Sequence, residues 1–125
     1  MECQAQDIAN VILVQIIGRI DYTTANAFEH ALLPLLDGCS AEGKKALLDL
    51  SGVVYMSSAG LRVLTIAAKQ CRQRNGEIAV AALQPLLQEV FKIGRLEIIF
   101  KVFKTVREAL EAISPAAAAA YGRPA

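Results

Sequence analysis

The chain has 125 residues, of which 54% are hydrophobic and 20% charged, and its formal net charge is +1 at pH 7. This length fits one domain with its own core. The high share of apolar residues excludes an intrinsically disordered chain. The near-neutral net charge favours neither nucleic-acid binding nor attachment to an acidic membrane. Because its apolar runs are much shorter than the about 20 residues of a membrane-spanning helix and its first residues lack a signal-peptide pattern, we expect a soluble, cytoplasmic protein.

Strand patterns dominate the first twenty residues. Val11–Ile17 is rich in β-branched side chains and predicts a strand buried on both faces, which Gly18 would end. Glu2–Gln6 alternates weakly between polar and apolar residues and predicts an edge strand. The two segments are expected to pair across a turn near residues 7–10 and to form the first hairpin.

Helices and strands alternate in the rest of the chain. The predicted elements, in order, are a helix capped by Thr23 or Thr24 that runs to about Leu36, a strand at Ala46–Leu50, a helix from Ser58 to about Asn75, a strand at Ile78–Ala81, a helix from Pro85 to Gly94, a strand at Ile98–Val102, and a helix that begins after Thr105 and runs to Ile113. This alternation predicts an α/β fold, a single domain with a mixed, mostly parallel sheet of about five strands and about four helices.

Residues 115–125 contain five consecutive alanines and differ in composition from the segments before them. Alanine has too little apolar bulk to dock firmly on a core, so we expect a flexible tail or a helix extension. The folded domain is therefore predicted to span residues 1–114.

Cysteine and histidine give no support to a metal site. Cys3, Cys39 and Cys71 are widely spaced, without the CxxC or Cys/His pattern of a zinc site, and their odd number does not suggest a disulfide framework. Cys71 falls in a helical pattern and is expected to be a small buried residue. The single histidine, His30, has no companion and is expected to be solvated or packed on its helix. The sequence thus predicts neither a metal nor a cofactor.

The most informative segment is Asp49–Arg62, with the sequence DLSGVVYMSSAGLR. It predicts a buried strand that is followed by a polar turn and then by a helix, with Ser57 and Ser58 at the helix N-terminus. We call this strand-to-helix turn the elbow. The first backbone N–H groups of a helix lack intrahelical partners and the helix dipole is positive there, so a serine hydroxyl or an added phosphate is well placed. Taken alone, this local chemistry favours plain capping by the serines over a modification site.

The same segment resembles the signature of STAS domains, specifically the single-domain anti-sigma factor antagonists. The resemblance covers about residues 8–113, and its other anchors are Gly18-Arg19-Ile20-Asp21, Gly76 and Thr105–Ile113. It implies that Ser58 is the regulatory phosphoacceptor, with Ser57 as the second choice. One common form of the motif has Asp before the acceptor and Ser or Thr after it, whereas this chain has Ser57 and Ala59.

The resemblance also implies a function as an anti-sigma factor antagonist. The unphosphorylated chain would bind a serine-kinase anti-sigma factor and so release a sigma factor. The kinase would use ATP to phosphorylate Ser58 and disable binding, and a PP2C-type phosphatase would restore it. The residues assigned to the partner-binding patch are Asp21, Ser57, Ser58, Ala59, Gly60 and Arg62.

Several residues near the elbow have alternative interpretations. Asp21 is expected to share a surface with Ser58, since loops at the same strand ends cluster, but it fits an Asx turn or a helix cap equally well. Gly60 is expected to leave room for a partner backbone. Arg62 fits a solvated helix face but is close enough to touch a partner or a phosphate. Asp49 is expected to end its strand and brace the elbow.

No catalytic constellation is present in the sequence. A hydrolase-type Gly-x-Ser-x-Gly elbow would need a glycine where Met56 stands, and no nucleotide-binding glycine motif occurs. We therefore expect a binding protein and not an enzyme. The alternative is a STAS scaffold or transporter-complex subunit in which Ser58 is only a cap. A small enzyme or nucleotide-binding protein of the same fold class has less support.

Overall fold

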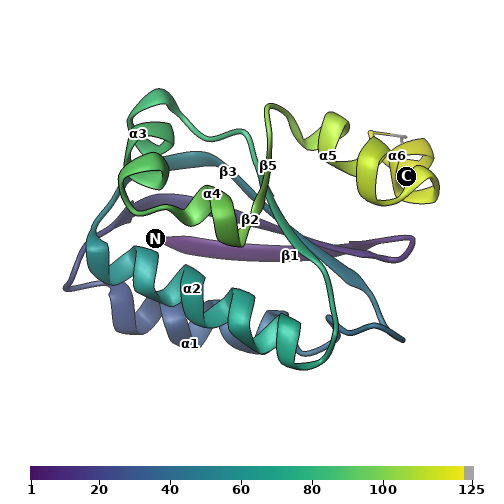
Figure 1. Cartoon of the computed structure of the whole chain (residues 1–125), viewed down its shortest axis with the longest axis horizontal. Helices are drawn as coiled ribbons and strands as arrows, with labels where there is room; N and C mark the ends of the chain where they lie inside the picture. The colour runs from purple at the N-terminus through teal and green to yellow at the C-terminus, as the bar shows by residue number, and fades with distance from the viewer. Residues whose placement is uncertain (123–125) are drawn as a thin grey trace.

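A single mixed sheet organises residues 1–122, the part of the chain that the computed structural model describes. Its strands lie in the spatial order β1-β2-β3-β4-β5, with β1 antiparallel to β2 and every later pair parallel (Figure 1). The strands are β1 (Glu2–Ile8), β2 (Val11–Ile20), β3 (Lys45–Met56), β4 (Ile78–Ala81) and β5 (Lys101–Phe103). The predicted α/β class and the mostly parallel sheet of five strands are confirmed.

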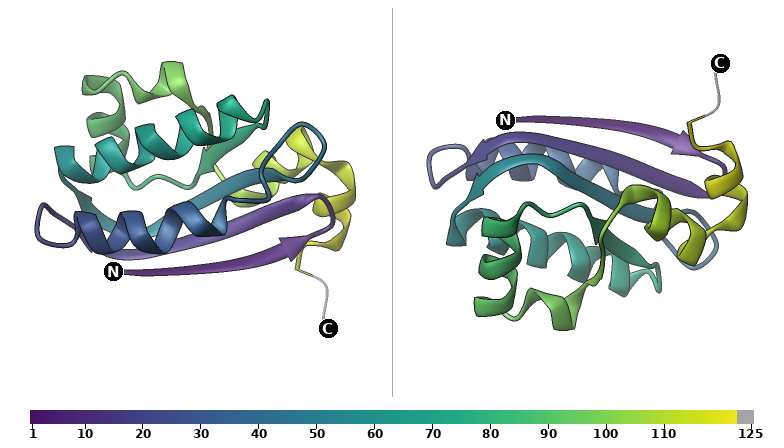
Figure 2. Two further views of the ribbon diagram at one scale, coloured as in Figure 1. Left: turned by 90° about the horizontal axis from the view of Figure 1, so that it is seen from below. Right: turned by 90° about the horizontal axis from the view of Figure 1, so that it is seen from above.

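Helices cover both faces of the sheet. They are α1 (Ala25–Leu35), α2 (Ser58–Gln73), α3 (Pro85–Ile93), α4 (Leu96–Ile99), α5 (Val106–Ile113) and α6 (Pro115–Ala120). The larger core lies between the sheet and the helices α1 to α4, and a smaller core lies beneath α5 and α6. The views from below and above show the two sets of helices on opposite sides of the sheet (Figure 2). About four helices were expected, and the two additional ones are the short helices α4 and α6.

The strand β2 continues past the glycine that was expected to end it. Gly18 has a φ of +111°, and the register with β3 shifts between Gln15 and Ile17 and again between Gly18 and Arg19. A positive φ suits glycine, and a Cβ there would lie 3.1 Å from the Cα of Met1. Gly18 therefore makes an irregularity within the strand, and β2 runs on to Ile20.

The strand β3 is also longer than predicted and leads directly into the elbow. Because Val53, Val54 and Tyr55 favour extended backbone, β3 runs to Met56. Asp49 consequently lies inside the strand, where its Oδ1 accepts a hydrogen bond from the Ser51 N–H at 3.0 Å. The expectation that Asp49 ends the strand and braces the elbow is wrong.

The predicted last strand at Ile98–Val102 is only partly correct. A turn of helix, α4, occupies its first half, and β5 begins at Lys101. Arg95 has a φ of +57° and redirects the chain after α3, so that Leu96 and Phe100 are both buried one turn apart. A short apolar run does not distinguish a buried helical turn from a strand by its periodicity, and here its first half is helical.

The remaining helices agree with the pattern that predicted them. Pro85 opens α3, and Thr105 caps α5 by accepting a hydrogen bond from the Glu108 N–H at 3.0 Å. Cys71 is buried on α2 and His30 is exposed on α1, as expected.

The alanine-rich segment after residue 114 docks on the domain despite its small side chains. Ser114 accepts a hydrogen bond from the Ala117 N–H at 3.2 Å, Pro115 opens α6, and Ala117 is buried in the smaller core. Of the two expected states, a flexible tail or a helix extension, residues 115–120 are helical, and the burial of Ala117 shows that they dock. Residues 123–125 of the predicted flexible tail lie outside the described residues.

Candidate functional site

Ser57 and Ser58 have different structural roles at the elbow between β3 and α2. Ser57 is the N-cap residue, with φ −80° and ψ 173°, and its Oγ accepts a hydrogen bond from the Gly60 N–H at 3.4 Å. Its backbone N–H donates to the carbonyl oxygen of Ile20 at 2.8 Å. Ser58 is the first helical residue and is exposed, whereas Ser57 is half-buried. The capping role expected for a serine here is therefore performed by Ser57, and the Ser58 hydroxyl is the accessible one.

Gly60 has a packing role that differs from the one expected. The residue is buried, and a Cβ at this position would lie 2.6 Å from the Cγ of Met56 and 2.8 Å from the Cγ2 of Ile20. The first turn of α2 therefore packs directly against the ends of β2 and β3. The expectation that Gly60 leaves room for a partner backbone is wrong, because residues of this chain already fill that space.

Asp21 lies next to the elbow because of the strand register. Ile20 pairs with Met56 at the ends of the parallel strands β2 and β3, so the next residues, Asp21 and Ser57, leave the sheet side by side. The expected proximity of Asp21 to the serines is confirmed. Ala59, in the first turn of α2, is half-buried, and Arg62, one turn further along the helix, is exposed.

The carboxylate of Asp21 also organises the start of α1. Its Oδ1 accepts hydrogen bonds from the backbone N–H groups of Thr23 at 2.9 Å and Thr24 at 3.2 Å, and the Thr24 Oγ1 accepts from the Asp21 N–H at 3.0 Å. A hydrogen bond from the Thr23 hydroxyl is the main reason that the pKa of Asp21 is lowered. Asp21 therefore forms the Asx-turn arrangement that its sequence position allowed, and it contributes a negative charge beside the elbow at neutral pH.

Other side chains near the elbow were not singled out from the sequence. The Arg19 guanidinium lies 4.2 Å from the centre of the Tyr55 ring and its Nε lies 3.5 Å from the Asp21 Oδ2. Tyr22, in the loop after β2, is 82% exposed, and Ile93, at the end of α3, is also 82% exposed. The sequence contained a signal for Tyr22, because a large side chain in a polar loop directly after a strand indicates an exposed binding residue.

The elbow surface carries an apolar residue on each side. Tyr22 follows Asp21 directly, which places it on the β2 side of the serines. On the other side, a Cβ at Gly94 would lie 3.6 Å from the Cδ1 of Leu61, so the end of α3 borders the first turn of α2. We use the term elbow surface for Asp21, Tyr22, Ser57, Ser58, Arg62 and Ile93. It presents an exposed tyrosine and an exposed arginine, residue types that are enriched where proteins bind one another.

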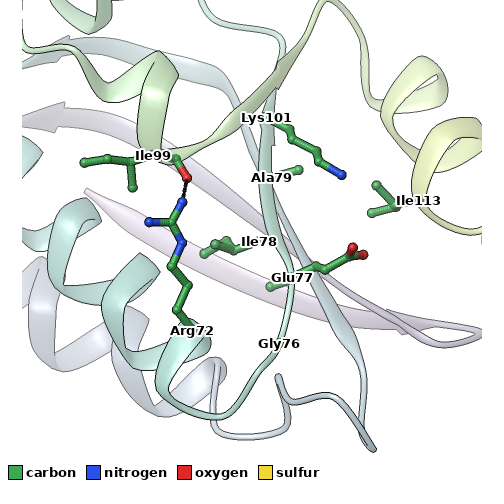
Figure 3. A pocket seen from close by; sticks show the side chains of 9 residues that line it. Arg72, Gly76, Glu77, Ile78, Ala79, Ile99, Lys101 and Ile113 are labelled. Carbon is green, nitrogen blue, oxygen red and sulfur yellow. Dashed lines mark hydrogen bonds between the residues drawn. The ribbon is translucent and has the colours of Figure 1, made fainter.

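The pocket drawn in Figure 3 lies away from this surface. It has a volume of about 170 Å³ and lies at the beginning of β4 and β5, with Arg72, Glu77 and Lys101 among its lining residues. The Arg72 side chain is held by the carbonyl oxygen of Ile99. The elbow follows the carboxyl end of β3, so this pocket contains none of the predicted site residues.

Neither a metal-binding cluster nor a membrane-spanning helix is found among residues 1–122. Residues 1–122 contain no group of three or more His, Cys, Asp or Glu side chains arranged to hold a metal ion. No helix within the same residues is long and apolar enough to cross a membrane.

The family model of the STAS domain matches residues 2–109, which include every strand of the sheet and the elbow. The chain belongs to the STAS domain family. The resemblance that the Asp49–Arg62 segment carried is thereby confirmed, together with the fold that it implied.

Similar STAS proteins carry related names. BtrV of Bordetella bronchiseptica, named as a candidate anti-sigma factor antagonist, is 34% identical over 112 residues, which are 90% of this chain and 93% of BtrV. The structure of an anti-sigma factor antagonist from Mycobacterium paratuberculosis is 26% identical and has a TM-score of 0.78, covering 90% of this chain and 92% of the other. The anti-sigma factor antagonist SpoIIAA in its unphosphorylated form, at 13% identity, has the same fold, with a TM-score of 0.70 and coverage of 90% and 96%.

Proposed function

We propose that this STAS protein is an anti-sigma factor antagonist that switches between partners through phosphorylation of Ser58. In the unphosphorylated state the elbow surface binds a serine-kinase anti-sigma factor, which then releases its sigma factor. The observation that carries the proposal is the division of roles at the elbow, where Ser57 caps α2 and Ser58 presents an exposed hydroxyl beside Asp21. The names of the relatives BtrV and the M. paratuberculosis antagonist support it.

The proposed modification is a phosphoryl transfer in which this protein is the substrate. The Ser58 Oγ attacks the γ-phosphorus of ATP bound to the kinase, a P–O bond to Ser58 forms, and ADP leaves. A base of the kinase takes the hydroxyl proton. A PP2C-type phosphatase reverses the state by hydrolysing the phosphoserine to serine and inorganic phosphate. This chain supplies the acceptor and the binding surface, and its partners supply the catalytic groups.

Phosphate changes the surface without disturbing the fold. A phosphoserine carries about −1.5 to −2 charges at pH 7, and the N-terminus of α2 tolerates an anion. The elbow surface holds one negative residue, Asp21, and one positive residue, Arg62, so phosphorylation changes its formal charge from zero to about −1.5 to −2. A partner interface fitted to a neutral hydroxyl would then have to bury a phosphate for which the partner offers no cation, at a cost of several kcal/mol, and about 1.4 kcal/mol already changes affinity tenfold.

A labelling experiment tests the acceptor directly. The chain is incubated with ATP labelled at the γ-phosphate and with its cognate kinase-type anti-sigma factor, and incorporation is compared among wild type, Ser58→Ala and Ser57→Ala. We expect Ser58→Ala to abolish incorporation and Ser57→Ala to retain it. Equal labelling of wild type and Ser58→Ala would show that the acceptor is another residue.

A further inference from the structure

Ser58 and Arg62 lie on one face of α2, one helical turn apart. Side chains four residues apart in a helix are neighbours, with Cβ atoms about 5–6 Å from each other. Both side chains are exposed, so neither is held in the core. The order also matters, since an anion that precedes a cation by four residues is the more stabilising arrangement. An anion attached to Ser58 would therefore have Arg62 as its nearest cation along the helix.

Arg62 has no acidic neighbour on its own helix. The sequence of α2, SAGLRVLTIAAKQCRQ, contains neither Asp nor Glu. The ion pairs found among residues 1–122 use Arg19, Lys44, Lys45 and Arg74, and none uses Arg62. Arg19, the other arginine near the elbow, already lies on the Tyr55 ring and beside Asp21. Arg62 is thus the cation near Ser58 that no carboxylate engages within the described residues.

We propose that Arg62 positions the phosphate of phosphorylated Ser58. Its planar guanidinium donates two parallel N–H···O hydrogen bonds to the phosphate oxygens, a geometry that lysine cannot reproduce. This inference rests on the proposed function, because it requires Ser58 to be the acceptor. It assigns phosphorylation two effects on the elbow surface: a dianion is added, and Arg62 is withdrawn from contact with a partner and held against α2.

The test uses a chain that carries phosphoserine at position 58 from its synthesis, so that no kinase is needed. The second pKa of the phosphate, about 6 in an unperturbed phosphoserine, is measured by ³¹P NMR titration in wild type, Arg62→Gln and Arg62→Lys. A cation that binds the dianion lowers this pKa. Lys69→Gln is the matched control, because it removes one positive charge from the same helix about 16 Å from Ser58 along the axis.

We expect the phosphate pKa to be lower in wild type than in Arg62→Gln by roughly 0.2 to 0.4, with Arg62→Lys between them and Lys69→Gln equal to wild type. Equal pKa values in wild type and Arg62→Gln would overturn the proposal. A change in Lys69→Gln as large as that in Arg62→Gln would also overturn it, because the effect would then come from the general charge of the helix. All three substitutions change exposed residues, so the variants are expected to keep the fold.

Failure of this inference and failure of the proposed function give different results. If the labelling experiment finds no phosphate on Ser58 while the titration shows the expected difference, Arg62 binds a phosphate that the cognate kinase does not install. If Ser58 is labelled and the titration shows no difference, the switch operates without Arg62.

Discussion

The backbone N–H of Ser57 donates a hydrogen bond to the carbonyl oxygen of Ile20 at 2.8 Å. This contact continues the parallel ladder between β2 and β3 by one step beyond the last paired residues, Ile20 and Met56. It fixes the point at which β3 stops and α2 begins. As a consequence Ser57 is held in place as the N-cap, and the next hydroxyl along the chain, that of Ser58, projects from the first helical residue.

The two serines are expected to contribute differently to stability. Ser57→Ala removes the N-cap hydrogen bond and should lower the free energy of unfolding by about 0.5–1 kcal/mol, at the lower end of cap substitutions because the bond is long at 3.4 Å. Ser58→Ala changes an exposed residue and should stay within about 0.5 kcal/mol of wild type. Urea unfolding of both variants measures the difference. The opposite ranking would contradict the assignment of Ser57 as the cap.

Gly60→Ala is expected to destabilise the fold although alanine favours helices. The added methyl group would lie 2.6 Å from the Cγ of Met56 and 2.8 Å from the Cγ2 of Ile20. Two such close contacts favour the upper part of the range of about 1–3 kcal/mol for overpacking, which is more than the propensity gain of about 1 kcal/mol. Gly38→Ala is the control, because its Cβ would meet only the Cδ1 of Ile12, at 3.4 Å. Thermal unfolding compares them. A Gly60→Ala variant as stable as wild type would show that the first turn of α2 does not pack closely against the ends of β2 and β3.

Asp21 is expected to make stability depend on pH. Its pKa is lowered in the folded state, so its stabilising contribution is present above the unfolded pKa of about 3.9 and is lost as pH falls through the lower folded value. Asp21→Asn keeps the shape of the side chain but does not titrate. The difference in urea midpoint between wild type and this variant should therefore shrink below about pH 4. A constant difference from pH 7 to pH 3 would contradict the lowered pKa.

The exposed apolar residues beside the elbow are expected to contribute to partner binding. Tyr22→Ala and Ile93→Ser should each weaken binding of the unphosphorylated chain to its anti-sigma factor by roughly tenfold, since aromatic and large apolar anchors supply much of the affinity of an interface. Ile98→Ser is the matched control, because Ile98 is 74% exposed on α4 and lies outside the elbow surface. Calorimetric titration measures the affinities. Equal loss in Ile98→Ser and Ile93→Ser would indicate a partner surface on α4 as well.

Where a local pattern determined the structure, the sequence was sufficient to predict it. The buried strand β4 and the Thr105 cap of α5 depend on a few adjacent residues and agree with the prediction. The elbow was predicted for the same reason, since β-branched residues, two serines and a helical pattern follow one another. The neighbourhood of Asp21 and the serines followed from the rule that parallel strands end at the same edge of a sheet.

Contacts between distant segments explain what the sequence did not show. Gly60 is required because Ile20 and Met56, on two different strands, fill the space beside it. Arg95 has a positive φ, and the residues after it form the helical turn α4 where a strand was predicted. No residue pattern indicated a positive φ at an arginine. The exposure of Tyr22 and Ile93 depends on how the loops after β2 and α3 pack, which periodicity does not describe.

The central claim is that phosphate on Ser58 controls partner binding while the fold is retained. It is tested most directly by titrating the cognate kinase-type anti-sigma factor with the unmodified chain and with the chain carrying phosphoserine at position 58, and Ser58→Asp serves as a second variant. We predict an affinity at least tenfold weaker for the phosphorylated chain, weakened binding by Ser58→Asp, and unchanged thermal stability of both. Equal affinity of the phosphorylated and unmodified chains would contradict the account.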